Sequence, residues 1–209
     1  MRPEAHTTGH RAVGAARLLP LRPGYLAAMN AITLLKNDHK TVEDLFKRFE
    51  KLGPRAHKSK QDVVERIIRE LSIHAAIEEM IFYPAIREAS DDMVKESLEE
   101  HHIVKWVLSE LEKMPADHER FDAKVTVLME NVRHHVEEEE SDLFPKVTKM
   151  FEKADLDELG DAMAQAKKTV PTRPHPRSPD EPPGNLVAGA GAALMDKAME
   201  AGKKLVGRG

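Results

Sequence analysis

The sequence predicts an all-α protein: an up-down-up-down bundle of four helices, preceded by a disordered leader and followed by a proline-rich tail. Two observations support this prediction. Only 4% of the 209 residues are aromatic and 33% are charged, a composition more typical of a helical protein than of a β-sandwich. Apolar residues also recur at spacings of three and four along four long segments, which is the period of one helix face. The segments are joined by short connections, as in an up-down bundle.

The first 28 residues are expected to be a disordered leader, because they are rich in Arg, Ala, Gly and Pro and keep no helical period. The periodic pattern begins immediately after Met29, so we expect translation to start there rather than at Met1. A targeting peptide is the less favoured interpretation, since no convincing cleavage pattern follows the short apolar stretch.

The bundle domain is expected over residues 30–153. Its four helices are predicted over residues 31–52, 59–89, 92–113 and 117–153. Ser90 and the two aspartates after it provide the turn and N-cap residues before the third helix. Pro84 and Pro145 lie near the ends of the second and fourth helices, where each is expected to introduce a kink.

Three further segments are expected after the bundle. Residues 154–169 should form a short helical extension, and residues 170–185 a proline-rich linker. Residues 186–209 are weakly amphipathic, which makes them a candidate for docking on the bundle or on a protein partner. The plainer interpretation is a marginal tail helix weakened by its glycines.

The composition also excludes several classes of function. The chain has no cysteine, so disulfides, iron-sulfur clusters and thiolate zinc sites are excluded, and any metal must take nitrogen and oxygen ligands. The net charge of −4 arises from opposing charges spread along the chain, which gives no basic patch for nucleic acid. No apolar run approaches the length of a membrane span. We therefore expect a cytoplasmic protein without nucleic acid as a partner.

One motif occurs twice. Residues 74–84 read His-x-x-x-Glu-Glu-x-x-apolar-aromatic-Pro, and residues 135–145 repeat this pattern. Positions i and i+4 of a helix lie on the same face, so each copy presents an imidazole and a carboxylate together. This arrangement is typical of a helix that binds a metal.

A second duplication involves a lone histidine in each half of the chain. The segment around Asp38 and His39 resembles the segment around Glu100 and His101, with the acid, the histidine and the apolar spacing kept. The chain is therefore two copies of a helix pair, each with one lone histidine followed by one His-x-x-x-Glu.

Two positions have adjacent histidines, and the helical period decides between them. His101 lies in the apolar stripe of its helix, whereas His102 faces polar neighbours. His135 lies ten residues before a proline, as His74 does, whereas His134 breaks this register. The period selects His101 and His135.

Each signal also has a plainer interpretation. A lone His39 or His101 on an apolar face is more often a hydrogen-bonded core residue, and the run Glu137–Glu140 alone is usually a solvated face. Together, however, these groups would be buried without partners, at a cost of about 1–3 kcal/mol for each. A bound metal removes this conflict. The sequence therefore predicts a metal site at His39, His74, Glu78, His101, His135 and Glu139.

These motifs resemble those of the hemerythrin-like domains, the HHE cation-binding family, over about residues 30–153. The resemblance implies a four-helix bundle that holds a non-haem centre of two iron ions. The four histidines would be terminal ligands, and Glu78 and Glu139 would bridge the irons. Glu79 and Glu140 would lie beside the centre or at the surface, because position i+5 has rotated off the histidine face. Manganese or zinc is compatible with the same ligand types.

The sequence departs from the oxygen-carrying members of the family at Lys105, which lies four residues after His101 where they have a fifth histidine. About two of roughly twelve coordination positions would then be open. The resemblance thus implies reactivity with peroxide, oxygen or nitric oxide in stress defence rather than oxygen carriage. The pattern is similar to that of the family's iron-cluster repair branch and of peroxide-degrading members, although the cysteine-bearing N-terminal region of the repair proteins is lacking.

Whether the protein is an enzyme stays open at this level, and no catalytic residue is identified. The alternative is an iron sensor, storage or delivery protein without turnover that uses its C-terminal segment to reach a partner. Tyr83 and Trp106 are candidates for tuning the metal pocket, but such residues more often belong to the core.

Overall fold

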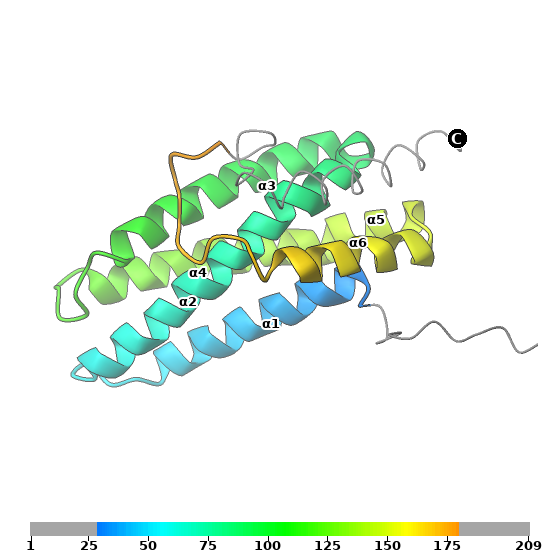
Figure 1. Ribbon diagram of the computed structural model, residues 1–209. Helices are drawn as coiled ribbons and strands as arrows, with labels where there is room; N and C mark the ends of the chain where they lie inside the picture. Colours follow the sequence, from blue (N-terminus) through cyan, green and yellow to red (C-terminus); the bar gives the residue numbers. More distant parts are fainter. Residues whose placement is uncertain (1–28, 180–209) are drawn as a thin grey trace, which may run out of the picture.

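The computed structural model describes residues 29–179. The predictions for the leader and for residues 180–209 lie outside this range. Within it the chain is all-helical, as the sequence predicts (Figure 1). The elements are α1 (Ala31–Glu50), α2 (His57–Ile77), the π-helical turn η1 (Glu78–Phe82), α3 (Tyr83–Leu111), α4 (Phe121–Glu138), the π-helical turn η2 (Glu139–Leu143), α5 (Phe144–Met150) and α6 (Lys153–Ala166).

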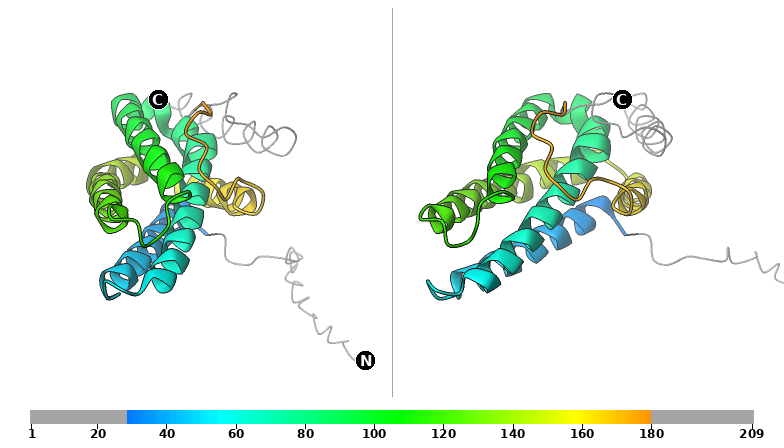
Figure 2. Two further views of the ribbon diagram at one scale, coloured as in Figure 1. Left: turned by 90° about the vertical axis from the view of Figure 1, so that its left-hand side faces the viewer. Right: turned by 60° about the vertical axis from the view of Figure 1, so that its left-hand side comes forward.

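The predicted bundle of two helix pairs is confirmed. Helix α1 packs against α2, and α3 packs against α4. Helix α6 lies outside these four, against α1 and η1, as the two views of Figure 2 show. Gly160 allows this close approach, because a Cβ at this position would lie 1.8 Å from the carbonyl oxygen of Met29. None of the described helices is long and apolar enough to cross a membrane.

The helix boundaries differ from the prediction in one informative way. The second predicted helix, residues 59–89, is α2, η1 and the first turns of α3, and the chain then bends at Ser90, whose φ and ψ are −154° and 41°. The predicted turn at this point is therefore a sharp bend within α3 rather than a loop. The fourth predicted helix is likewise divided into α4, η2 and α5.

A π-helical turn ends shortly before each of the two prolines. Proline has no N–H to donate, and its ring clashes with the preceding turn of an α-helix. Just before Pro84, Tyr83 N–H donates to the carbonyl of Glu78, and just before Pro145, Phe144 N–H donates to the carbonyl of Glu139. These bonds span five residues instead of four, which widens the helix at this turn. Each wide turn begins at the glutamate of the duplicated motif.

A polar layer divides the apolar core into two parts. On α1 the residue Leu35 belongs to one apolar cluster and Val42 to the other, with His39 between them. On α3 the same holds for Leu98 and Val104, with His101 between them. The candidate site therefore crosses the middle of the bundle, with packed apolar side chains at both ends.

Candidate metal centre

The structure brings the six predicted site residues together in this layer. Each is at most 6% exposed: His39, His74, Glu78, His101, His135 and Glu139. The choices made from the helical period agree with burial, since His102 is exposed and the side chain of His134 is 63% exposed. Trp106 is 50% exposed, so its predicted place in the pocket or the core is wrong.

Each glutamate lies between the two helix pairs. Glu78 Oε2 is 3.1 Å from His74 Nε2 and 3.4 Å from His101 Nε2. Glu139 Oε2 is 3.2 Å from His39 Nε2 and 3.6 Å from His135 Nε2. A carboxylate placed between two histidines in this way is suited to bridge two cations.

Several buried polar atoms at the centre have no hydrogen-bond partner. They are His39 Nε2, His74 Nε2, both carboxylate oxygens of Glu78 and Glu139 Oε2. An unsatisfied buried polar atom costs about 1–3 kcal/mol. Imidazole nitrogens and carboxylate oxygens are also ligands for iron, manganese and zinc. The donor set therefore fits a bound metal, and no protein group satisfies these atoms.

A carboxylate faces the Nδ1 atom of every histidine in the set. His39 donates to Glu140 at 2.9 Å, His101 to Glu79 at 3.1 Å and His135 to Glu100 at 2.7 Å. His74 Nδ1 lies 3.7 Å from Asp38. In His39, His101 and His135, a proton held on Nδ1 by the carboxylate would leave the lone pair of Nε2 available to a metal, which is the usual arrangement of metal-binding histidines.

These carboxylates follow the duplication. The acid before each lone histidine, Asp38 or Glu100, serves the motif histidine of the same helix pair, and Glu79 and Glu140 each serve a lone histidine of the other pair. Glu79 and Glu140 thus lie beside the centre, one of the two placements predicted for them. Asp38 and Glu100 were not identified from the sequence, although the matched acid-histidine pairs were the signal for them.

Lys105 lies four residues after His101 and turns to a carboxylate. Its Nζ donates to the two carboxylate oxygens of Glu79 at 2.8 and 3.0 Å, and both residues are buried. Since Glu79 also accepts from His101, the lysine supports one ligand of the centre indirectly. Lys105 Nζ is thus directed at Glu79 and serves as a hydrogen-bond donor rather than as a ligand.

Tyr83 contacts two residues of the centre, Glu139 and His101. Its hydroxyl donates to Glu139 Oε1 at 2.9 Å and lies 3.4 Å from His101 Nε2. Burial and the charge of Glu139 raise the pKa of Tyr83 well above its usual range. The phenol therefore stays protonated and directs Glu139 toward the histidines.

Without a metal, the pKa values of the two glutamates shift in opposite directions. Burial and the charge of Glu139 raise the pKa of Glu78 well above its usual value. Burial also acts to raise the pKa of Glu139, but His135 and His39 outweigh it and the pKa is lowered. Burial lowers the pKa of His74 to about 4, so this histidine is neutral at pH 7. A cation at the centre would allow both carboxylates to be ionised.

A small cavity of about 20 Å³ adjoins the four histidines. Its other walls are apolar side chains: Val42, Leu71, Ala75, Val104, Val132 and Val136. A volume of about 10–15 Å³ is enough for one water molecule. The cavity is therefore about the size of one water molecule, and it lies directly against the imidazoles.

Comparison with known proteins identifies the family. The family profile described as the hemerythrin HHE cation binding domain matches residues 30–147. A hemerythrin-like protein of Schizosaccharomyces pombe is 32% identical over 136 residues, which cover 63% of this chain and 67% of the relative. Rv2633c of Mycobacterium tuberculosis is 29% identical over 65% of this chain and 84% of its own length.

A solved structure agrees with these matches. The crystal structure of the Rv2633c homologue from Mycobacterium kansasii, a hemerythrin HHE cation binding domain-containing protein, superposes with a TM-score of 0.58 and 26% identity. The match covers 66% of this chain and 85% of that one. With its duplicated motifs, its helical bundle and its buried histidine and glutamate layer, this chain belongs to the hemerythrin HHE cation-binding family.

Proposed function

We propose that this protein holds a non-haem centre of two iron ions and reacts with peroxide, oxygen or nitric oxide in oxidative or nitrosative stress defence. The observation that carries the proposal is the pair of glutamates, each lying between two histidines beside a cavity of about 20 Å³. Membership of the family indicates cation binding. The metal, the number of ions and the substrate are the parts that we add.

The six buried side chains would have two roles. The Nε2 atoms of the four histidines would be terminal ligands, and Glu78 and Glu139 would bridge the two ions. When bound, the irons supply the redox chemistry, for which the side chains of the centre have no equivalent. The protein supplies ligation, orientation and a shielded space.

Three features favour a reactive centre over a storage site. The position four residues after His101, where the oxygen-carrying members of the family have a fifth histidine, is Lys105, and its Nζ donates to Glu79. The apolar wall of the cavity excludes bulk water while leaving room for a small molecule. Tyr83 keeps its proton and holds Glu139 in one orientation.

Peroxide turnover by anaerobically prepared di-iron protein tests the proposal. We expect a rate well above that of the same concentration of free iron, because the centre is fixed and shielded. The control is the double variant His74→Ala and His135→Ala, which should lose metal and activity together. A rate no higher than that of free iron would refute the catalytic version, and full metal content in the double variant would refute the ligand assignment.

The second candidate function is an iron sensor, storage or delivery protein. It is favoured by the weakly amphipathic sequence of the C-terminal segment, residues 186–209, which is a candidate for docking on a protein partner. Deletion of the chain after about residue 169 distinguishes the two. Unchanged turnover supports the catalyst, whereas lost iron transfer or a lost protein partner supports the alternative.

The metal itself and the location of the protein are tested directly. Elemental analysis and an optical spectrum of protein from its own host should give iron, and manganese or zinc at full occupancy would contradict the proposal. A cytoplasmic location stays a prediction, to be checked by fractionating the host.

A further inference from the structure

We infer that small molecules reach the metal centre from a surface groove between α1 and α4, through a wall formed by Val42, Val132 and Val136, and that these valines set the size of the molecule admitted. The inference rests on the proposed function, because it supposes that a small molecule must reach the buried histidines. It adds the route and the residues that control it.

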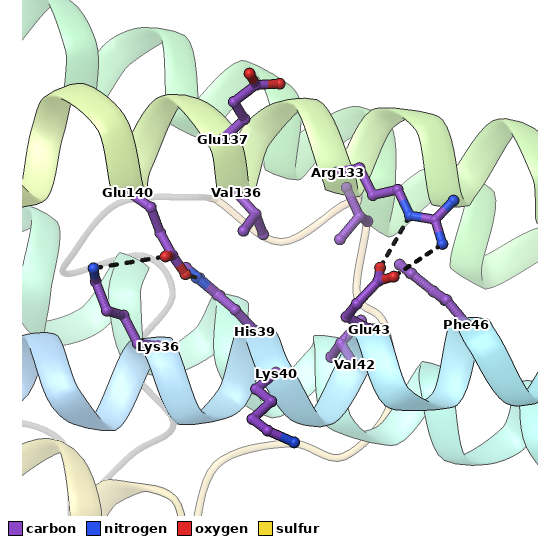
Figure 3. A pocket seen from close by; sticks show the side chains of 11 residues that line it. Lys36, His39, Lys40, Val42, Glu43, Phe46, Arg133, Val136, Glu137 and Glu140 are labelled. Carbon is purple, nitrogen blue, oxygen red and sulfur yellow. Dashed lines mark hydrogen bonds and ion pairs between the residues drawn. The ribbon is translucent and has the colours of Figure 1, made fainter.

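The groove and the internal cavity share one wall. The groove has a volume of about 410 Å³ and lies over α1 and α4 (Figure 3). Four residues line both this groove and the cavity against the histidines: His39, Val42, Val132 and Val136. Only side chains therefore separate the groove from the cavity at this point.

His39 lines both the groove and the cavity. Its Nε2 lies 3.2 Å from Glu139 at the centre, whereas its Nδ1 donates to Glu140, which lines the groove. Figure 3 shows His39 and Glu140 meeting between the two helices. The ring of Phe144 stacks on His39 at 5.8 Å with an interplanar angle of 8°, so one face of the imidazole is covered. A small molecule that passes His39 must therefore pass between the valine side chains.

The other walls of the cavity lead into the bundle. Leu71 and Ala75 come from α2 and Val104 from α3, and none of the three lines the groove. The valine wall instead reaches the surface, because Val136 is only partly buried and lines the groove. Valine has short, stiff side chains, so small shifts of the helices are enough to pass a molecule of a few atoms.

The charges of the groove are balanced, which indicates the kind of molecule admitted. Three basic and three acidic side chains line it: Lys36, Lys40, Arg133, Glu43, Glu137 and Glu140. Two pairs among them are in contact, Lys36 with Glu140 at 3.6 Å and Arg133 with Glu43 at 2.9 Å. An apolar wall behind paired charges opposes the passage of an ion, which would lose its hydration. The route therefore suits small uncharged molecules, the chemical class of hydrogen peroxide, oxygen and nitric oxide.

Nitric oxide is a suitable probe, since it is uncharged and has two atoms. Its association with and dissociation from the di-ferrous protein are followed by stopped-flow absorbance in Val136→Ala, which widens the wall, and Val136→Leu, which narrows it. The matched control is Val125→Ala, a buried valine of the same helix that lines neither space. Metal content and circular dichroism establish that each variant is loaded and folded.

We expect association about tenfold slower in Val136→Leu and a few-fold faster in Val136→Ala, with the control unchanged. Dissociation should change by the same factor as association, so the Kd for nitric oxide stays constant, as a change in the path alone requires. Equal rates in all variants would overturn the inference. A changed Kd with an unchanged association rate would also overturn it, because it would place the effect at the metal.

The outcome is separable from that of the proposed function. Rates of nitric oxide binding that follow the valines, without peroxide turnover in the parent protein, would support the route and refute peroxide turnover as the function. Peroxide turnover with nitric oxide rates insensitive to the valines would support the function and refute the route.

Discussion

The two motif histidines, His74 and His135, occupy equivalent places in the two helix pairs but have different partners. Glu100 accepts from His135 Nδ1 at 2.7 Å, whereas Asp38 lies 3.7 Å from His74 Nδ1. Burial lowers the pKa of His74 to about 4. Burial also acts to lower the pKa of His135, but Glu139 and Glu100 outweigh it and raise the pKa. Equivalent residues in a duplicated chain thus differ in basicity.

Burial is the largest cause of the lowered pKa of His74, and a lysine outside the duplicated helices adds a further difference between the two halves. Lys167, just after α6, donates to Asp38 at 2.5 Å, and this carboxylate is shared between the lysine and His74. Glu100 instead lies near a second histidine, His134, at 3.8 Å. The two halves would therefore offer two metal ions unequal donors.

The lone histidines differ in a second way. Glu140, beside His39, is 35% exposed and faces Lys36 at the groove. Glu79, beside His101, is buried and is held by Lys105. The half containing His39 is the open one, and the half containing His101 is closed. The duplication has kept the candidate ligands and changed what supports them.

The largest expected effect is on metal content. Glu139→Ala removes a carboxylate that lies between His39 and His135, so both metal positions should be lost. His74→Ala removes a ligand of only one metal position, so about one of the two ions should stay bound. Elemental analysis after gel filtration measures both. Equal metal loss in the two variants would contradict the assignment of Glu139 as the bridge.

A smaller effect is expected on stability from Lys105. Lys105→Met leaves the buried carboxylate of Glu79 without its cation, and breaking a buried ion pair costs about 3–5 kcal/mol. Urea unfolding should show this loss, and the double variant Lys105→Met and Glu79→Gln should recover part of it.

The matched control is Lys36→Met in the open half. Its ion pair with Glu140 is 3.6 Å long and largely exposed, so the loss should be below about 1 kcal/mol. Similar losses in Lys105→Met and Lys36→Met would show that the two halves are not as different as burial indicates.

Much of the fold and the set of candidate residues follow from the sequence, for a physical reason. Both the helical period and the metal motif are local: His74 and Glu78 are four residues apart, so a helix alone places them together. The duplication then relates the two pairs. The predicted helices, the buried layer and the choice of His101 over His102 depended only on these two regularities.

What the sequence did not predict depends on contacts between distant segments. The π-helical turns before Pro84 and Pro145 are a local exception, since the prolines were expected to kink the helices rather than to follow a widened turn. The ion pair of Lys167 with Asp38 joins residues 129 positions apart, and no period relates them. Trp106 was assigned to the pocket or the core from its residue type alone, which says nothing of the helix face on which it lies.

The smallest expected effect tests the contrast between His74 and His135. In the metal-free protein the pKa of His74 is about 4, against its ordinary value of 6.5. Between these values the unfolded chain binds a proton that the folded chain does not, so the free energy of unfolding falls as pH decreases from 6.5 toward 4. For this one group the loss is about 2–3 kcal/mol.

Lys167→Met should reduce that loss. Without the lysine, Asp38 interacts with His74 alone, so the pKa of His74 rises toward its ordinary value and the decrease in stability between pH 7 and 4.5 becomes smaller by up to about 1 kcal/mol. Comparing each protein with itself at two pH values largely cancels the lost ion pair, which is missing at both. Lys168→Met is the control, because Lys168 bonds to Gln165 on the surface rather than to Asp38. If urea unfolding gave the same pH dependence for Lys167→Met as for the parent protein, Lys167 would not be the source of the difference between the two halves.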